Sequence, residues 1–206
     1  MKIVDQSVEL LWITTDPEKQ IEIAGRTCYK SEDRITHNSA GRFVAMLKDS
    51  GHHAMLEHAV ASFKIITDRG ISHEIVRHRI ASYAQESTRY CNYSKEKFGK
   101  ECTFIQPPDL SYGQTIAWRN ACRYAESFYF ELLDAGCSPQ IARSVLPNCL
   151  KTEIVMTANL REWRHFIKLR SSKAAHPQIR TIAHSIWEVL MGLAPDVFDD
   201  LTPLSR

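Results

Sequence analysis

Cations, hydroxyl groups and an amide are concentrated in one short stretch near the middle of the chain. Residues 77 to 90 read R-H-R-I-A-S-Y-A-Q-E-S-T-R-Y, which places two guanidinium groups around an imidazole at the start of the stretch. Planar guanidinium groups match phosphate oxygens in pairs, and hydroxyl groups donate to the same oxygens. The stretch therefore indicates a site for an anionic ligand. Its candidate residues are Arg77, His78, Arg79, Ser82, Gln85, Ser87, Thr88, Arg89 and Tyr90.

Two further arginines interrupt apolar helix faces elsewhere in the chain. Arg143 lies in the segment I-A-R-S-V-L-P, and Arg170 follows Trp163 and Ile167 at helical spacing. A guanidinium group that points inward without a partner is very costly, so each arginine should meet an anion. That anion can be an internal aspartate or glutamate, or a phosphate that several arginines share. For either arginine taken alone, the sequence leaves both possibilities open.

The composition is that of one globular domain with a sizeable core. The chain has 206 residues, of which 44% are hydrophobic and 24% are charged. We therefore expect a single domain over residues 1–206. The net charge of +2 is too small for a general nucleic-acid or membrane-surface binder. Anion recognition must come from the local arrangement of side chains.

The sequence carries no recognisable targeting signal or paired-cysteine motif. Its first twelve residues include acids and lack a small-residue cleavage site, which fits neither a signal peptide nor an anchor. Its apolar runs are too short to span a membrane. The six cysteines form no C-x-x-C pair, which argues against a zinc ribbon or a redox dithiol. We expect a reducing cytoplasm, which would be a host's cytoplasm if the gene is viral.

Hydrophobic periodicity predicts an α+β fold with a few strands and several helices. Strands are expected at 59–67, 102–106 and 150–157. Residues 68–70 are expected to form a turn, and 80–95 a long ligand-binding loop. Helices are expected at 16–29, 38–51, 71–79 and 112–135, and from Ser138, Asn159 and Pro177 onward, with Asn159 as a cap.

The same periodicity predicts which side chains face the core. In the first strand these are Ala61, Phe63 and Ile65. His78 continues the face of Ile71 and Ile75, and its cationic neighbours also suit the end of a helix, where they complement the dipole. The row with the clearest helical spacing is Ala117, Ala121, Tyr124, Phe128 and Leu132. Other residues expected to point inward are Phe43, Met46, Leu47, Ile141 and Val145.

The histidine-rich stretch G-H-H-A-M-L-E-H at 51–58 has the residue types of a zinc site but lacks the spacing. H-E-x-x-H is absent, and the inverted motif would need a histidine where the chain has Ala54. We therefore expect no metal, and we interpret His52, His53 and His58 as hydrogen-bonding groups at the edge of a polar cavity.

Nucleophilic catalysis and simple binding are two competing hypotheses. The cysteines and nine histidines leave many nucleophile–base pairings open. Cysteines, however, are more commonly small buried side chains than catalytic nucleophiles. Ser82 and Ser87 lack a G-x-S-x-G elbow, which favours binding phosphate over attack on carbon. A non-catalytic nucleotide- or RNA-binding module would use the same arginines with tyrosines as stacking faces, but the chain has no basic stripe.

Together these motifs resemble those of the flavin-dependent thymidylate synthases. The signature of that family is R-H-R followed by seven residues and a serine, which is Ser87 in this chain. The resemblance covers nearly the whole chain, and it implies the thymidylate synthase-complementing fold, with a small, mostly antiparallel sheet packed with several helices. It extends through the motifs at 51–58, S-T-R-Y at 87–90, I-A-R-S-V-L-P at 141–147, T-A-N at 157–159 and H-F-I-K-L-R at 165–170.

The resemblance implies reductive methylation of dUMP to dTMP, with roles for individual residues. FAD would carry hydride, NADPH would be the reductant, and 5,10-methylenetetrahydrofolate would donate the carbon. Members are homotetramers with active sites shared between subunits. Arg170 would be catalytic, stabilising negative charge that develops on the uracil ring. Residues implied for FAD are His52, Arg77, His78, Arg79, Asn159, Arg161 and His165. Those implied for dUMP are Glu74, Arg77, Gln85, Ser87, Arg89, Arg143 and Arg170.

The chain departs from the family pattern at a few positions. Ala84 stands where the commoner signature has asparagine, and Gln85 stands where many members have glutamate. His176 lies near the expected flavin edge, and its role is open. A rival enzyme, the cysteine-dependent thymidylate synthase, requires Pro-Cys-His around its nucleophile, whereas this chain has P-N-C-L at 147–150.

Overall fold

The chain folds into two compact units, described separately below. A computed structural model describes residues 1–203. The chain passes between the units within strands β2 (Ser7–Ile13), β3 (Val60–Asp68), β4 (Ala81–Gln85) and β6 (Lys151–Asn159), and also between Arg77 and His78. The mixture of helices and a small sheet confirms the α+β class, and the single domain over 1–206 stays a prediction. The first unit comprises residues 1–7, 66–77 and 84–154, and the second comprises 8–65, 78–83 and 155 onward.

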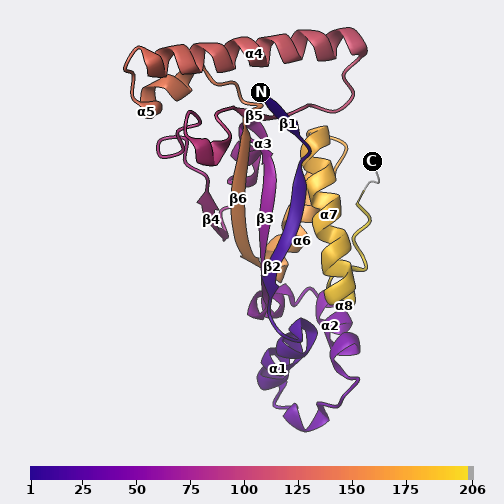
Figure 1. Ribbon diagram of the computed structural model, residues 1–206. Coiled ribbons are helices and arrows are strands. Elements are labelled where there is room, and N and C mark those ends of the chain that lie inside the picture. Colours follow the sequence, from indigo (N-terminus) through magenta and orange to yellow (C-terminus); the bar gives the residue numbers. More distant parts are fainter. Residues whose placement is uncertain (204–206) are drawn as a thin grey trace. The chain divides into compact units, whose positions relative to one another are not determined.

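The first unit is built around a small apolar core. Strand β1 (Lys2–Val4) pairs in parallel with β5 (Thr103–Ile105), and Phe104 forms an antiparallel bridge with Leu150. The buried core residues are Tyr93, Cys102, Phe104, Cys122, Tyr129, Ala142 and Leu150. The helices of this unit are α3 (Arg69–Ile75), α4 (Tyr112–Asp134) and α5 (Pro139–Ala142), with 3-10 turns at Glu96–Phe98 and Arg143–Val145 (Figure 1).

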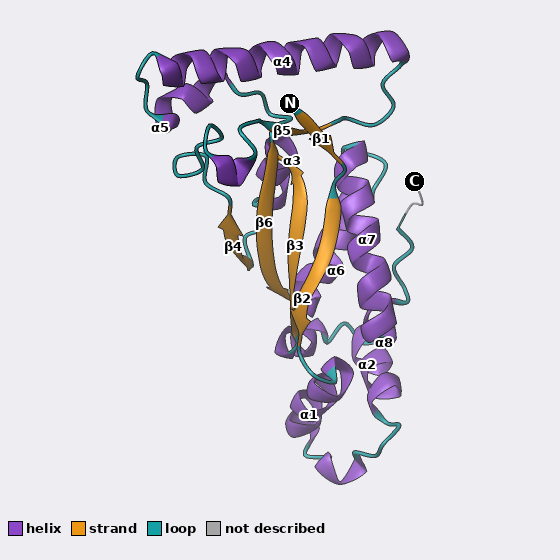
Figure 2. Cartoon of the chain, viewed as in Figure 1, coloured by secondary structure: helices purple, strands orange, loops and turns teal. Residues whose placement is uncertain are grey.

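Helix α4 is the longest element (Figure 2). One of its faces is both apolar and exposed. It begins with a capping box in which the Ser111 hydroxyl accepts from the Gln114 amide while the Gln114 side chain accepts from the Ser111 amide. Cys122 and Tyr129 are buried on its inner face. The exposed apolar residues, which we call the α4 row, are Tyr112, Ile116, Tyr124 and Phe128.

The second unit packs helices with strands whose order in the sheet is β2-β3-β6-β4, where β2 spans Ser7–Ile13. Helix α1 packs on α2, α2 on α8, and α7 on both α6 and α8 (Figure 1). The helices are α1 (Pro17–Tyr29), α2 (Ala40–Asp49), α6 (Leu160–Arg170), α7 (Pro177–Leu193) and α8 (Pro195–Phe198), with 3-10 turns at Glu32–Arg34 and His53–His58.

The core of the second unit joins the strands to α6 through one tryptophan. Trp163 is fully buried, and its ring meets Phe63 edge-on with centroids 5.0 Å apart. Its indole N–H donates to the Ala61 carbonyl at 3.1 Å, so the polar end of the side chain is satisfied inside the core. The predicted inward faces of β3 and α6 are therefore confirmed.

Asn159 places the start of α6 directly at the end of β6. Its Oδ1 accepts from the Glu162 backbone N–H at 2.8 Å, which satisfies one of the otherwise unpaired N–H groups of the first turn. The Leu160 N–H donates to the Ala59 carbonyl of the neighbouring segment. The predicted cap is confirmed, and the polar residues of the first turn are held at a fixed position.

Several expectations about local structure are wrong. Arg69 starts α3 instead of forming a turn, because the Asp68 carboxylate caps the helix by accepting from the Ile71 N–H at 2.7 Å. Residues 81–85 form β4 within the segment expected to be a loop. Strand β2 is not among the expected elements; its alternation is obscured by Leu11 and Trp12, which are adjacent in sequence and both exposed.

The expected inward faces of three helices need correction. On α4, Ala117, Ala121, Tyr124 and Phe128 are exposed, and the buried residues are Cys122 and Tyr129. Met46 is 39% exposed on α2, where Val44 is buried beside Phe43 and Leu47. Ile141 and Val145 are exposed as well. Helix α5 is a single turn followed by a 3-10 turn, so a regular helical face cannot be extrapolated through it.

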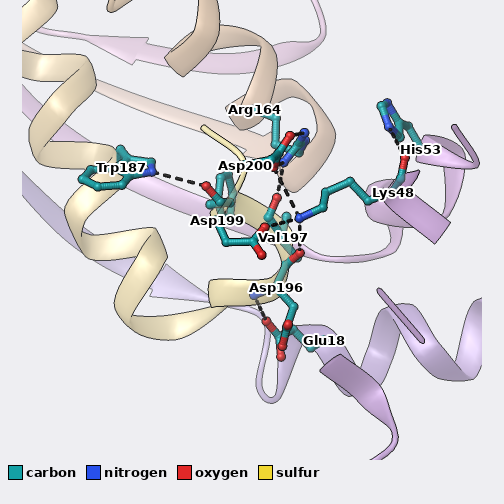
Figure 3. Close-up of polar contacts among 10 residues, drawn as sticks. Glu18, Lys48, His53, Arg164, Trp187, Asp196, Val197, Asp199 and Asp200 are labelled. Atoms are coloured by element: carbon teal, nitrogen blue, oxygen red, sulfur yellow. Dashed lines mark hydrogen bonds and ion pairs between the residues drawn. The ribbon is translucent and has the colours of Figure 1, made fainter. Parts of the chain in front are cut away.

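A network of charges holds the C-terminal segment of the second unit (Figure 3). The Lys48 ammonium group contacts the Asp196 carbonyl at 3.0 Å and the carboxylates of Asp199 and Asp200. Arg164 of α6 binds both oxygens of Asp200 at 2.6 Å. The hydrogen bond from Arg164 and its positive charge lower the pKa of Asp200 to about 2. The segment after α8 is therefore tied to both α2 and α6.

Replacing Asp200 by asparagine should reduce stability in a pH-dependent way. We expect Asp200→Asn to lower the free energy of unfolding by about 1 kcal/mol at pH 7, the upper end for ion pairs that are screened by solvent. The folded-state pKa is below the ordinary value of 3.8, so this stabilisation is present above that value and is lost as the pH falls toward 2. Urea unfolding at several pH values measures the difference.

The matched control is Glu96→Gln, which removes one partner of the exposed pair with Lys100. We expect it to change the free energy of unfolding by less than about 0.5 kcal/mol. An Asp200→Asn variant that loses the same stability at pH 7 and at pH 2 would contradict the proposed contribution of this ion pair.

Candidate functional site

A pocket of about 370 Å³ opens in the second unit where α6 begins. It contains Asn159, Arg161 and His165, three of the residues that the family resemblance implies for FAD. The N–H groups at the start of a helix and the positive end of its dipole favour anionic ligand groups. The complete lining is Glu57, Ile80, Asn159, Arg161, Glu162 and His165.

Charges of both signs line this pocket. Arg161 Nη1 donates to Glu57 Oε1 at 2.6 Å, and both side chains are about half exposed. His165 is exposed, whereas Glu162 is buried. The pocket therefore offers guanidinium, imidazole and amide donors at its surface and a carboxylate at depth. Such donors can bind a flavin ring system and phosphate oxygens.

His78 is buried beside the pocket, between two charged residues of α6. One ring nitrogen, Nδ1, is 3.0 Å from Glu162 Oε1, and the other, Nε2, is 3.1 Å from Arg170 Nε. The ring centroid is 4.8 Å from that of Phe166. Burial lowers the pKa of His78; hydrogen bonding to Glu162 opposes this, and the charge of Arg170 adds to it. The imidazole is therefore neutral near pH 7.

His78, Glu162 and His165 bring possible metal ligands within 4.8 Å of one another. Both ring nitrogens of His78 already take part in hydrogen bonds, and the guanidinium group of Arg170 lies against one of them. A second positive charge at this position would be repelled. The arrangement is better suited to orienting Arg170 than to holding a cation, and the absence of a metal stays a prediction.

In the first unit, Arg143 meets the polar segment that follows β4. Its Nη1 donates to the buried Thr88 hydroxyl at 2.9 Å. The carbonyl of Ser87 accepts from two backbone N–H groups, of Tyr90 and Cys91, which makes a tight turn. Arg89 is exposed and lies over the Tyr90 ring, 5.5 Å from its centroid. The structure thus brings Arg143 to the segment that carries Ser87, Thr88 and Arg89, and we call these four residues the patch of the first unit.

Gln85 is anchored near this patch at the end of β4. Its Nε2 donates to the hydroxyls of Ser72 at 2.8 Å and Thr152 at 3.1 Å. Glu74 is half-buried on α3 in the same unit. The residues predicted for dUMP therefore belong to the first unit, with the exception of Arg170. This set is Glu74, Arg77, Gln85, Ser87, Arg89 and Arg143.

The other predicted cofactor residues take different positions. His52 is exposed, and its Nδ1 lies 2.9 Å from the Tyr29 hydroxyl, so the structure does not place it in the lining of the pocket. Arg77 and Arg79 are exposed on either side of the buried His78. With the exception of Arg77, the residues predicted for FAD belong to the second unit.

Sequence reasoning missed Glu162, Glu57 and Tyr83. The Tyr83 hydroxyl donates to the His78 carbonyl at 2.6 Å, and burial raises the pKa of Tyr83 to about 12, so it remains a donor. Glu162 could have been found, because it precedes Arg170 by eight residues, which places both on the same side of the helix. Nothing local in the sequence marks Glu57 as the partner of Arg161.

The environment of the thiols argues against three cysteine nucleophiles. Burial raises the pKa of Cys102 to about 12 and also raises that of Cys91. The pKa of Cys122 is raised by its contact with Cys149, whose sulfur is 3.6 Å away, and by burial. A nucleophilic cysteine must form a thiolate, which these surroundings oppose.

The fold is shared with a protein of known structure. The UMP/dUMP methylase PolB from Streptomyces cacaoi, solved bound with 5-Br dUMP, superposes with a TM-score of 0.82. The match covers 97% of this chain and 96% of that protein at 24% identity. This likeness shows an α+β fold of the same kind. Among the described residues, none of the helices combines the length and apolarity that a membrane span requires.

Sequence comparison then gives the family. The profile described as "Thymidylate synthase complementing protein" matches residues 9–196. The flavin-dependent thymidylate synthase of Geobacter sulfurreducens is 34% identical over 95% of this chain and 87% of its own length. That of Pyrococcus furiosus is 34% identical over 88% and 73%. The chain belongs to this family and is an enzyme of the flavin-dependent thymidylate synthase class.

Proposed function

We propose that this chain converts dUMP to dTMP by reductive methylation. The carbon donor is 5,10-methylenetetrahydrofolate, the hydride carrier is FAD, and the reductant is NADPH. The observation that carries the proposal is the pocket at the start of α6, where Asn159, Arg161 and His165 line one cavity. Family resemblance implies the same three residues for FAD.

The pocket residues fit a flavin by their chemistry. Asn159 and His165 offer an amide and an imidazole, which can bind the polar edge of a ring system, and Arg161 offers a guanidinium group for phosphate oxygens. Arg79 is exposed in the same unit and adds positive charge. When bound, FAD supplies the hydride chemistry that protein side chains lack.

The patch in the first unit is proposed to bind the phosphate of dUMP. Arg143 and Arg89 provide two guanidinium groups, and Ser87 provides a hydroxyl group in the same segment as Arg89 and Thr88, the partner of Arg143. Guanidinium groups bind phosphate oxygens in a bidentate manner, which gives orientation as well as affinity. The similar methylase from Streptomyces cacaoi was solved with 5-Br dUMP bound, which supports a substrate of this class.

Arg170 is proposed to act on the uracil ring. For methylation at C5, that carbon must act as the nucleophile, and activating the ring for this attack places negative charge on the ring carbonyl groups. A fixed guanidinium group near those oxygens stabilises the charge without reorganising in the reaction. The hydrogen bond from Arg170 Nε to His78 orients the guanidinium group at the end of α6.

Active sites shared between the subunits of a homotetramer are part of the proposal. The α4 row exposes four large apolar side chains, with exposed fractions from 44% for Ile116 to 85% for Tyr112. Rows of this kind on a long helix are typical of contacts between subunits. A second copy of the chain is the proposed occupant of this surface.

The flavin assignment predicts a yellow protein. Purified chain, or chain titrated with FAD, should absorb as a flavoprotein and release FAD rather than FMN on denaturation. His165→Ala should weaken FAD binding by about tenfold or more, which corresponds to about 1.4 kcal/mol. His37→Ala, an exposed histidine outside the pocket, is the control. A colourless protein that does not bind added FAD would contradict the flavin assignment.

Arg170→Lys separates a role at the uracil from a structural role. Lysine keeps the charge but loses the planar fork. We expect the variant to keep its fold and its FAD, and to retain bleaching of the flavin absorbance by NADPH. Its rate of dTMP formation should fall by about a hundredfold. If the variant formed dTMP at the parental rate, or if bleaching of the flavin fell together with dTMP formation, the proposed role of Arg170 at the uracil would be wrong.

The proposed assembly predicts a tetramer in sedimentation velocity. Replacing Tyr124 and Phe128 together by serine should shift the distribution toward smaller species, because it removes much of the apolar surface of the α4 row. Leu193→Ser, at an exposed apolar residue near the end of α7, is the control and should remain tetrameric. A fully active monomer would contradict shared active sites.

A further inference from the structure

Glu162, His78 and Arg170 form a continuous hydrogen-bonded chain along one face of α6. Glu162 and Arg170 are eight residues apart, so about 12 Å of helix axis separates them, and both project from the same face. His78 comes from outside the helix and spans this interval, with hydrogen bonds of 3.0 Å and 3.1 Å at its two ring nitrogens. Phe166 lies midway, against the imidazole ring.

The donors and acceptors fix which nitrogen of His78 carries the proton. An arginine nitrogen can only donate, so His78 Nε2 must accept from Arg170 Nε. A neutral imidazole has one N–H group, which is then at Nδ1 and donates to Glu162. The His78 side chain is 2% exposed and that of Glu162 is 8% exposed, so water has little access to compete. Neutral histidine in water prefers the opposite tautomer, with the proton at Nε2.

The backbone of His78 is held as firmly as its ring. The Tyr83 hydroxyl donates to the His78 carbonyl at 2.6 Å. The titratable groups that face the imidazole are Glu162, His165 and Arg170 from α6, whereas Tyr83 of β4 meets the backbone carbonyl. Protonation of His78 would turn Nε2 into a donor that faces another donor, and the bond to Arg170 would be lost.

We propose that Glu162 and His78 are positioning residues for Arg170. The carboxylate fixes the tautomer of the imidazole, and the imidazole holds the guanidinium group in the orientation that meets the uracil ring. This proposal rests on the proposed function, because it assumes that Arg170 acts on the uracil. In this role both residues act through Arg170.

The first test observes the tautomer directly. Histidine labelled with ¹⁵N in the ligand-free protein should show one imidazole that is neutral at pH 7, protonated at Nδ1 and absent in His78→Asn. Glu162→Gln should shift this signal toward the Nε2-protonated form, because the amide can donate to Nδ1. If none of the nine imidazoles of the parent protein has the neutral Nδ1–H form, the proposal is overturned without recourse to any variant.

The second test separates positioning from a role in the flavin pocket, which Glu162 also lines. In Glu162→Gln we expect dTMP formation to fall by about tenfold, the scale of one well-placed hydrogen bond. The affinity for FAD and the bleaching by NADPH should stay near the parental values. The acid limb of the pH profile for dTMP formation should move to lower pH, because removing the carboxylate removes the group that raises the pKa of His78.

The matched control is Glu22→Gln, which changes another buried carboxylate of the same unit. Glu22 accepts from Arg26 on α1 and from the hydroxyl of Ser39, which directly precedes α2, and it is not among the charged groups that shift the pKa of His78. It should lower the free energy of unfolding and leave the tautomer and the pH profile unchanged. If Glu162→Gln instead weakens FAD binding and methylation by the same factor, Glu162 acts in the flavin pocket and the proposed positioning role is overturned.

The outcomes for the proposed function and for this role can be distinguished. A parent protein that binds FAD but forms no dTMP overturns the proposed function and this role with it. A parent protein that forms dTMP, and a Glu162→Gln variant with an unchanged rate, overturn the role of Glu162 and His78 alone.

Discussion

A neutral imidazole has a single N–H proton, and the candidate site depends on where His78 carries it. With that proton directed to Glu162, the other nitrogen can accept from Arg170. Three residues from two separate chain segments are then joined by hydrogen bonds. The strand–helix junction at Asn159 sets the position of Glu162, and Trp163 anchors the same turn in the core. The fold of the second unit thus determines where the pocket residue Glu162 lies, and through His78 it also determines the orientation of Arg170.

Much of the fold could be predicted from the sequence, where a pattern was long or chemically specific. The burial of Phe63 in β3 and the cap at Asn159 follow from period-two alternation and from the chemistry of an asparagine side chain. Strand β2 could not be predicted, because Leu11 and Trp12 both face outward and break the alternation. The start of α3 was missed because Asp68 acts as a cap there, and the same residue suits a turn equally well.

The site was only partly predictable, for a different reason. The motifs correctly indicated residues that gather, such as Arg143 with the segment after β4. They could not indicate that the residues implied for dUMP and for FAD fall largely into two compact units. They also gave no sign of the contact between His78 and Glu162, which are 84 residues apart. Such pairings depend on tertiary packing, and a single sequence carries no record of them.

The contact of His78 with Phe166 and Arg170 has a consequence for binding entropy. A free arginine side chain samples many rotamers, and fixing it costs about 2 kcal/mol. In this fold the imidazole, supported by the ring of Phe166, already restricts the Arg170 side chain before any ligand arrives. The entropic cost is therefore borne when the chain folds, and little of it is left to reduce the affinity for a nucleotide.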